Sequence, residues 1–329
     1  MKRNWLIVWM VLLLCLTACG KTAEQPAAEP DPVVVEQEVL PEAEPLTPLE
    51  ETAALLQNST PSPTVNSVGG EWLILGLARS GLEVDPAYYE QYYKNVEDYL
   101  TQCGGVLHDR KYSEYSRVIL ALTAIGKDPT NAAGFDLTKP LSNFDQTCFQ
   151  GINGPMFALI ALDSGSYEVP AADEGITQAT KDMYIDLLLE KQLENGGWCL
   201  TGDQMEVDMT AMALQALSNH LDRDDVASAV ERGVEALAQA PEAEGSESLS
   251  QTIVALAELG IPLTDERFVK DGCTLMDRLM DYRMPDGGFC HLMGEETNLM
   301  ATEQAFYAMV AAQRLEEGKS ALYDMNDGE

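Results

Sequence analysis

Three acidic residues, Asp208, Glu247 and Glu303, stand at or near the starts of apolar segments with helical periodicity. Pairs of carboxyl groups perform general acid–base chemistry, and glycosidases cleave sugars with two carboxyls about 5–10 Å apart. If the segments that carry these residues begin at one end of the fold, their carboxyls converge there. A carbohydrate-active enzyme is therefore one function that the sequence allows.

Other polar and aromatic residues occupy the same positions in the pattern, at the starts of the apolar segments. Polar residues at helix starts are mostly caps that accept backbone N–H groups, and some can also contact a ligand. The predicted ligand-binding residues are Trp72, Arg117, Asn153, Glu206, Asp208, Gln251 and Glu303. Three more residues belong to the same region: Glu71, Thr302 and Gln304.

Arg117 is the most informative of these residues, because it lies on an otherwise apolar segment. An unpaired charge in such a place is costly, so the guanidinium needs a partner. Two interpretations follow from the sequence. The first is a structural ion pair with Asp208 or Glu114, and the second is a contact with a bound ligand.

A repeat of roughly 40–55 residues positions these side chains and runs from about residue 48 onward. Six segments with small apolar residues nearly all round predict buried helices, most of which close on a glycine. They span residues 70–81, 114–126, 153–165, 207–217, 248–260 and 298–313. Six more amphipathic stretches alternate with them, at residues 48–57, 86–102, 141–150, 177–193, 224–238 and 265–283.

This alternation predicts an all-α fold, an α6/α6 toroid in which an outer ring of helices wraps an inner ring. A solenoid of the same hairpins also fits the period. In a toroid of hairpins every inner helix points the same way. The N-terminal residues of the inner helices then meet at one mouth, where the helix dipoles add positive potential.

Two glycine-rich turns carry a family resemblance. Residues 192–198, QLENGGW, resemble the Q-x3-G-G-W motif of squalene–hopene cyclases and related terpenoid cyclases. Residues 284–289, MPDGGF, resemble a degenerate copy of it, as in protein prenyltransferase β subunits. Apolar stretches such as VDMTAMALQAL are similar to the toroid domain of surface proteins of Firmicute-type bacteria. The resemblance covers about residues 48–325 and implies an α/α toroid.

For catalysis, the resemblance directs attention to residues 206–211, EVDMTA, which match the D-x-D-D-T-A motif of class II cyclases. In that family the middle Asp protonates an alkene, and the matching residue here is Asp208. Glu206 replaces the first acid and Met209 replaces the last, so a partner that would keep the carboxyl strongly acidic is missing. We favour the alternative, in which Asp208 is an N-cap of its helix.

Metal chemistry has little support. Asp271 and Cys273 resemble the Asp-x-Cys zinc pair of prenyltransferases and fall in the helical stretch before the second glycine-rich turn, but Ala301 stands where the family has a His. The histidines of the chain match no ligand spacing. The sequence therefore predicts no metal site and no cofactor.

The first residues predict export and lipidation. Lys2 and Arg3 precede an apolar run that ends in Leu-Thr-Ala-Cys, with the cysteine at position 19. This pattern resembles the lipobox of bacterial lipoproteins, which implies cleavage before Cys19 and diacylglycerol on its sulfur. We expect a signal peptide at 1–18, an acidic Pro/Ala/Glu-rich tether at 19–46 and the toroid domain at 47–329. The protein is then anchored to the cell membrane on its extracytoplasmic face.

The thiols that remain do not form a pairing pattern. Loss of Cys15 with the signal and lipidation of Cys19 leave five of the seven cysteines, an odd number without a CxxC motif. Such a set is a poor disulfide framework. We expect these cysteines to be small buried apolar side chains.

The charge of the chain excludes one class of function. It contains 20 Lys and Arg against 54 Asp and Glu, which gives a net charge of −34. A nucleic-acid partner bound by phosphate neutralisation is excluded by this balance. It also argues against adsorption to anionic lipid through a basic face.

The sequence thus favours a ligand-binding or interaction module without catalysis. Its expected partners are the membrane, through Cys19, and an unknown small-molecule or protein ligand at the mouth. One alternative is a terpene cyclase or prenyltransferase-like enzyme with Asp208 as its acid. The other is the carbohydrate-active enzyme with carboxylates at the mouth.

Overall fold

Twelve α-helices make up most of the regular structure in this computed structural model, which describes residues 45–241 and 245–326. Within those ranges the β-structure consists of isolated bridges, such as the one between Arg283 and Phe289. The all-α prediction is confirmed. The predicted signal peptide, Cys19 and the tether up to residue 44 lie outside the described residues.

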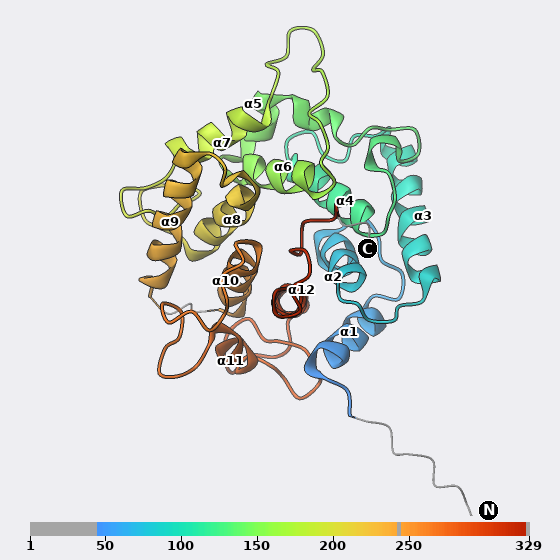
Figure 1. The fold of residues 1–329 in the computed structure, drawn as a ribbon. Helices are drawn as coiled ribbons and strands as arrows, with labels where there is room; N and C mark the ends of the chain where they lie inside the picture. Colours follow the sequence, from blue (N-terminus) through green and yellow to red (C-terminus); the bar gives the residue numbers. More distant parts are fainter. Residues whose placement is uncertain (1–44, 242–244, 327–329) are drawn as a thin grey trace, which may run out of the picture. The chain divides into compact units, whose positions relative to one another are not determined.

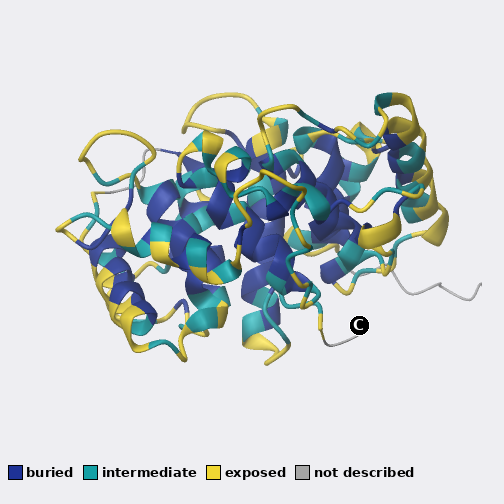
Figure 2. Cartoon of the chain, turned by 90° about the horizontal axis from the view of Figure 1, so that it is seen from above, coloured by how far each residue is buried: buried dark blue, intermediate teal, exposed yellow. Residues whose placement is uncertain are grey.

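The even-numbered helices form the core. They are α2 (Trp72–Arg79), α4 (Ser113–Ala124), α6 (Asn153–Ser164), α8 (Val207–Leu217), α10 (Ser246–Glu258) and α12 (Leu299–Glu316). Small side chains such as Ala158, Ala213 and Ala255 are completely buried, so the helices approach closely. Each packs against the next in chain order, and α12 packs against α2 (Figure 1). Figure 2 shows the resulting buried centre and the exposed loops along its edges.

The odd-numbered helices lie outside the even-numbered ones (Figure 1). They are α1 (Pro48–Ser59), α3 (Pro86–Cys103), α5 (Phe144–Thr147), α7 (Lys181–Glu190), α9 (Asp224–Ala238) and α11 (Leu275–Met280). Helix α1 packs on α12, α7 on α6, α9 on α8 and α11 on α10. Local signals begin these helices: Thr47 and Glu50 form a capping box before α1, and Asp85 caps α3.

Three of the predicted outer helices are wrong in extent. In the stretch 177–193 only α7 is helical, because Thr180 caps it and Gln178 pairs with Asn143 in an isolated bridge. Residues 141–150 do not form one helix but a series of short turns: η3 (Lys139–Ser142), α5 and η4 (Cys148–Gln150). Asn143 interrupts the series with an extended backbone and caps α5. In the stretch 265–283 only α11 is an α-helix, because Asp271 and Gly272 adopt positive φ angles of 53° and 82° in a turn before it.

The two glycine-rich turns have the same geometry. Trp198 N–H donates to Thr210 Oγ1, and Phe289 N–H donates to Thr302 Oγ1, each over 2.9 Å. Trp198 is completely buried, and its indole donates to the carbonyl of Leu188 over 2.7 Å. Gly196 is required in the first turn, since its φ is +90° and a Cβ atom would lie 2.5 Å from the carbonyl oxygen of Arg232.

The chain ends in a segment that the sequence did not predict. Residues 317–326, here called the C-terminal strap, follow α12 and run past the C-terminal ends of other even-numbered helices (Figure 1). Tyr323 N–H donates to Glu258 Oε1 at the end of α10, over 3.2 Å. Met325 N–H donates to the carbonyl of Ser164 at the end of α6, over 2.9 Å. Leu322 is completely buried, so the strap is part of the core.

Candidate functional site

Aromatic rings from three even-numbered helices meet beside the start of α2. Trp72 in the first turn of α2 contacts Phe157 on α6 and Tyr307 on α12, with ring centroids 5.8 and 5.7 Å apart. Both ring pairs are tilted, an arrangement that stabilises aromatic contacts. Trp72, a predicted ligand-binding residue, therefore already packs against other rings.

Arg117 is paired within the protein. Its guanidinium donates to Glu114, and its Nε lies 3.4 Å from an oxygen of Glu71. The predicted pair with Glu114 is therefore present, the pair with Glu71 is new, and neither Arg117 contact involves Asp208. Burial raises the pKa of the Glu71 carboxyl to about 8, although Arg117 acts to lower it.

Glu303 supports the turn that leads into α2. This turn, η1 (Ser67–Glu71), has non-helical backbone angles at Val68, Gly69 and Gly70. Gly69 N–H donates to Glu303 Oε1 over 2.6 Å. Gly70 has no room for a side chain, because a Cβ atom would lie 2.4 Å from the carbonyl oxygen of Thr64. Burial raises the pKa of Glu303 to about 7.

Gln251 belongs to a chain of amide and hydroxyl contacts that joins three helices. Gln215 on α8 donates to the side-chain oxygen of Gln251 over 3.0 Å. Gln251 in turn donates to Gln304 over 3.0 Å and to the Tyr307 hydroxyl over 2.6 Å. Every one of these side chains comes from α8, α10 or α12, so this network ties the helices together.

Asp208 does not cap its helix. Helix α8 begins at Val207 with Glu206 at the N-cap, which makes no side-chain cap bond, so Asp208 lies inside the first turn. The N-cap interpretation is therefore wrong, because the helix starts two residues earlier than it requires. Among the described residues, Asp208 Oδ1 has no hydrogen-bond partner. Burial raises the pKa of Asp208, the side chain of Ser248 lowers it, and the charges of Glu247 and Glu206 raise it.

The charges of Asp208, Glu247 and Glu303 all act on the pKa of one residue, Tyr307. Burial raises the pKa of Tyr307, and the charges of Glu303, Asp208 and Glu247 each add to that rise. Glu247 is buried, and its Oε2 lies 2.8 Å from Nδ1 of His291. The hydrogen bond to Glu247 raises the pKa of His291. His291 was not among the predicted site residues, because it enters from the loop before α12.

The remaining predicted residues have separate surroundings. The carboxylate of Glu206 is exposed and accepts the N–H of Leu200 over 3.2 Å. Asn153 is the half-buried first residue of α6, and its side chain makes no hydrogen bond within the described ranges. Thr302 supports the turn at Phe289, as described above.

No group of three or more metal-ligating side chains exists in the described part of the chain. Asp271 and Cys273 lie in the turn before α11 and not in a helix, which corrects their predicted placement. All five described cysteines are free thiols. Only Cys290 is buried, whereas Cys273 is exposed and the others are half-buried, so the prediction of buried cysteines holds for one residue.

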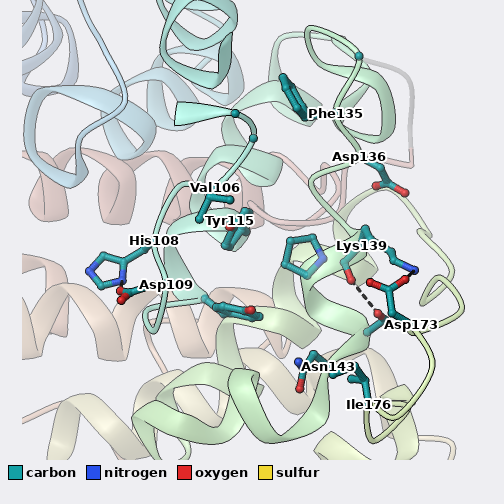
Figure 3. Close-up of a pocket in the computed structure, with 16 residues that line it drawn as sticks. Val106, His108, Asp109, Tyr115, Phe135, Asp136, Lys139, Asn143, Asp173 and Ile176 are labelled. Atoms are coloured by element: carbon teal, nitrogen blue, oxygen red, sulfur yellow. Dashed lines mark hydrogen bonds and ion pairs between the residues drawn. The ribbon is translucent and has the colours of Figure 1, made fainter. Parts of the chain in front are cut away.

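A cleft of about 480 Å³ lies beside these helix starts and has none of the predicted residues in its lining (Figure 3). One wall is the turn after α3 with Tyr112 and Tyr115, and the other wall runs from Gly134 to Asn143. Asp173 and Ile176 complete the far rim. The sequence did not predict this cleft, because the predicted helix begins only at residue 141 and the residues before it carry no helical pattern. The glycines at 104, 105 and 134 were the available signal.

No protein-family model, curated protein or solved structure matches this chain. Within the described ranges, none of the helices has the length and apolar character needed to cross a membrane. The function proposed for this protein therefore rests on its own residues and their contacts.

Proposed function

We propose that this protein is a lipid-anchored, extracytoplasmic binding module built on an α6/α6 toroid of the terpenoid cyclase and prenyltransferase type. The packing order of the even-numbered helices, with α12 against α2, supports the toroid. The matching glycine-rich turns at Trp198 and Phe289 support the resemblance. The lipobox that ends at Cys19 supports the anchor and the location.

One observation supports the binding function: the polar side chains at the helix starts form hydrogen bonds and ion pairs with one another. Arg117 is paired with Glu71 and Glu114, Glu247 with His291, and Gln251 with Tyr307. Side chains fixed in this way lose little freedom when a ligand binds, which favours recognition. A catalytic acid or base instead needs a proton that it can exchange with its substrate.

Native mass spectrometry of the full-length protein, extracted from its own membranes in mild detergent, tests this function. We expect a population that carries a bound mass. Gln251→Leu removes the central contact of the amide network and should abolish that mass. Gln91→Leu changes an exposed glutamine on α3 and should retain it. Absence of any bound mass in the wild type, or its survival in Gln251→Leu, would contradict binding at the helix starts.

A second candidate, an isoprenoid cyclase that uses Asp208 as its acid, is favoured by one feature. Asp208 has an oxygen without a partner among the described residues and a raised pKa, as a general acid requires. Asp208→Asn removes the transferable proton and keeps the shape. Squalene and polyprenyl diphosphates are the substrates to test, with product detection by mass spectrometry. Product from the wild type that vanishes in Asp208→Asn establishes the enzyme, and no product from either protein supports the binding module.

A further inference from the structure

The cleft in Figure 3 has the size of a small-molecule site and is independent of the helix starts discussed above. Its volume of about 480 Å³ falls within the usual range for ligand pockets. At Gly104 and Gly134 nothing lies within 4 Å of the position that a Cβ atom would occupy. A ligand can therefore approach the backbone of both walls closely.

Rigid flat surfaces line the cleft. Tyr112 packs on Tyr115 edge to face, with ring centroids 5.3 Å apart and planes at 72°. Phe135 lies directly over Gly105, where a Cβ atom would come within 2.3 Å of its ring. Val106 is 55% exposed and Ile176 is 41% exposed, so each wall also offers an aliphatic surface. Such surfaces suit a ligand with C–H faces that can pack against aromatic rings.

The lining of the cleft carries more carboxylates than ammonium groups. Its ionised side chains are Asp109, Asp136 and Asp173 against Lys139, and the adjoining residues add Arg110, Lys111 and Glu174. Lys139 Nζ lies 2.9 Å from Asp173 Oδ1, and Figure 3 shows the two side chains next to each other. This excess of carboxylates disfavours an anion as the ligand.

His108 is oriented by its own loop. Its Nδ1 lies 3.0 and 3.1 Å from the backbone nitrogens of Arg110 and Lys111, and 3.1 Å from Asp109 Oδ1.

Free hydrogen-bonding groups complete the lining. The Asn143 oxygen accepts Gln146 N–H over 3.1 Å, and within the described ranges its side-chain nitrogen has no partner. Asp136 uses Oδ1 to accept from the backbone and hydroxyl of Thr138, over 2.9 and 2.6 Å. Its other oxygen has no described partner. An amide donor and a carboxylate acceptor beside aromatic faces match the alternating hydroxyls and C–H faces of a sugar ring.

We propose that this cleft binds a neutral saccharide, with its ring against Tyr112 and Phe135 and its hydroxyls on Asn143 and Asp136. This site is separate from the helix starts, and its test does not depend on the bound mass sought there.

The test measures binding of four neutral trisaccharides, namely maltotriose, cellotriose, chitotriose and mannotriose, to the full-length protein by calorimetry and by saturation-transfer NMR. We expect saturable binding of at least one of them. Asn143→Asp keeps the oxygen that caps α5 but removes the amide donor, and it should weaken that binding about tenfold. Tyr99→Ala, an exposed tyrosine on α3 outside the cleft, is the matched control and should bind as the wild type does.

Choline is the opposing probe, because a cation gains from the carboxylate that Asn143→Asp creates. Choline binding that is stronger in this variant would overturn the proposal, as would failure of all four trisaccharides to bind the wild type. Saccharide binding that is equal in the wild type and Asn143→Asp would overturn it too.

Discussion

Glu71 and Glu303 are buried carboxyls on either side of the turn Ser67–Glu71. Their pKa values in the folded protein are about 8 and about 7, against an ordinary value of 4.5, because burial disfavours the charged form. The folded state therefore binds protons that the unfolded state releases. Their contribution to stability is complete below pH 4.5 and is lost as the pH rises through 7 to 8.

We therefore predict that the free energy of unfolding falls between pH 5 and pH 8. For Glu71, which is 1% exposed, the slope approaches at most about 1.4 kcal/mol per pH unit. Urea unfolding at several pH values measures it. Glu71→Gln should flatten this dependence, and Glu190→Gln, at an exposed carboxylate, should leave it unchanged. Stability that rises from pH 5 to pH 8 would contradict the raised pKa values.

At the scale of the element, the turn at Trp198 joins α7 to α8 and buries the largest side chain of the region. Trp198→Ala removes the ring from a completely buried site and the indole bond to Leu188. We predict a loss of about 3–5 kcal/mol in urea unfolding. Phe149→Ala, at a ring that is 57% exposed, should change stability by less than about 0.5 kcal/mol. A Trp198→Ala loss as small as that of the control would show that the turn does not support the fold.

The C-terminal strap is a second element whose contribution can be measured. Leu322→Ala leaves a cavity beside the ends of α6 and α10, so we predict a loss of about 2–5 kcal/mol. Hydrogen exchange should also become faster at Met325 N–H, which donates to Ser164. Unchanged stability together with unchanged exchange would mean that the strap rests on the surface of the helices without supporting them.

Local signals explain which elements the sequence predicted well. The ranges of α8 and α9 match their predictions, because an acid-rich first turn and an uninterrupted apolar period mark each of them. The prediction of one helix over residues 141–150 was wrong, because Asn143 ends one turn and caps the next. The C-terminal strap was not predicted, because its sequence has neither helical nor strand periodicity. Its burial depends on helix ends that are distant in sequence.

The contacts of the candidate site were likewise predictable only where they are local in sequence. The pairing of Arg117 with Glu114 was predictable, since the two residues lie one turn apart on α4. Two other contacts join different helices and loops, so no local pattern indicates them. They are Arg117 with Glu71 and Glu247 with His291. The cleft likewise combines segments between Gly104 and Ile176 that are distant in sequence, so no local pattern indicates it.

At the scale of the whole molecule, the proposed anchor makes a prediction about location. Cys19→Ala removes the sulfur that would carry diacylglycerol and with it the main membrane affinity. The variant should move from the membrane fraction into the medium or a soluble fraction, as followed by immunoblot. Ser59→Ala in the same strain controls for the effect of mutation on export. A Cys19→Ala protein that stays with the membrane after a carbonate wash would refute lipidation at this residue.

The contacts of α12 with α1 and α2 also bear on how the protein is made. Helices α1 and α2 are synthesised before α12, so the apolar faces that they present to α12 remain without that neighbour until α12 has been made. Pairing elements so distant in sequence slows folding and prolongs the lifetime of incomplete states. A chain that stops before Leu299 should therefore be a substrate for chaperones and proteases, whereas a chain that includes α12 covers these faces of α1 and α2.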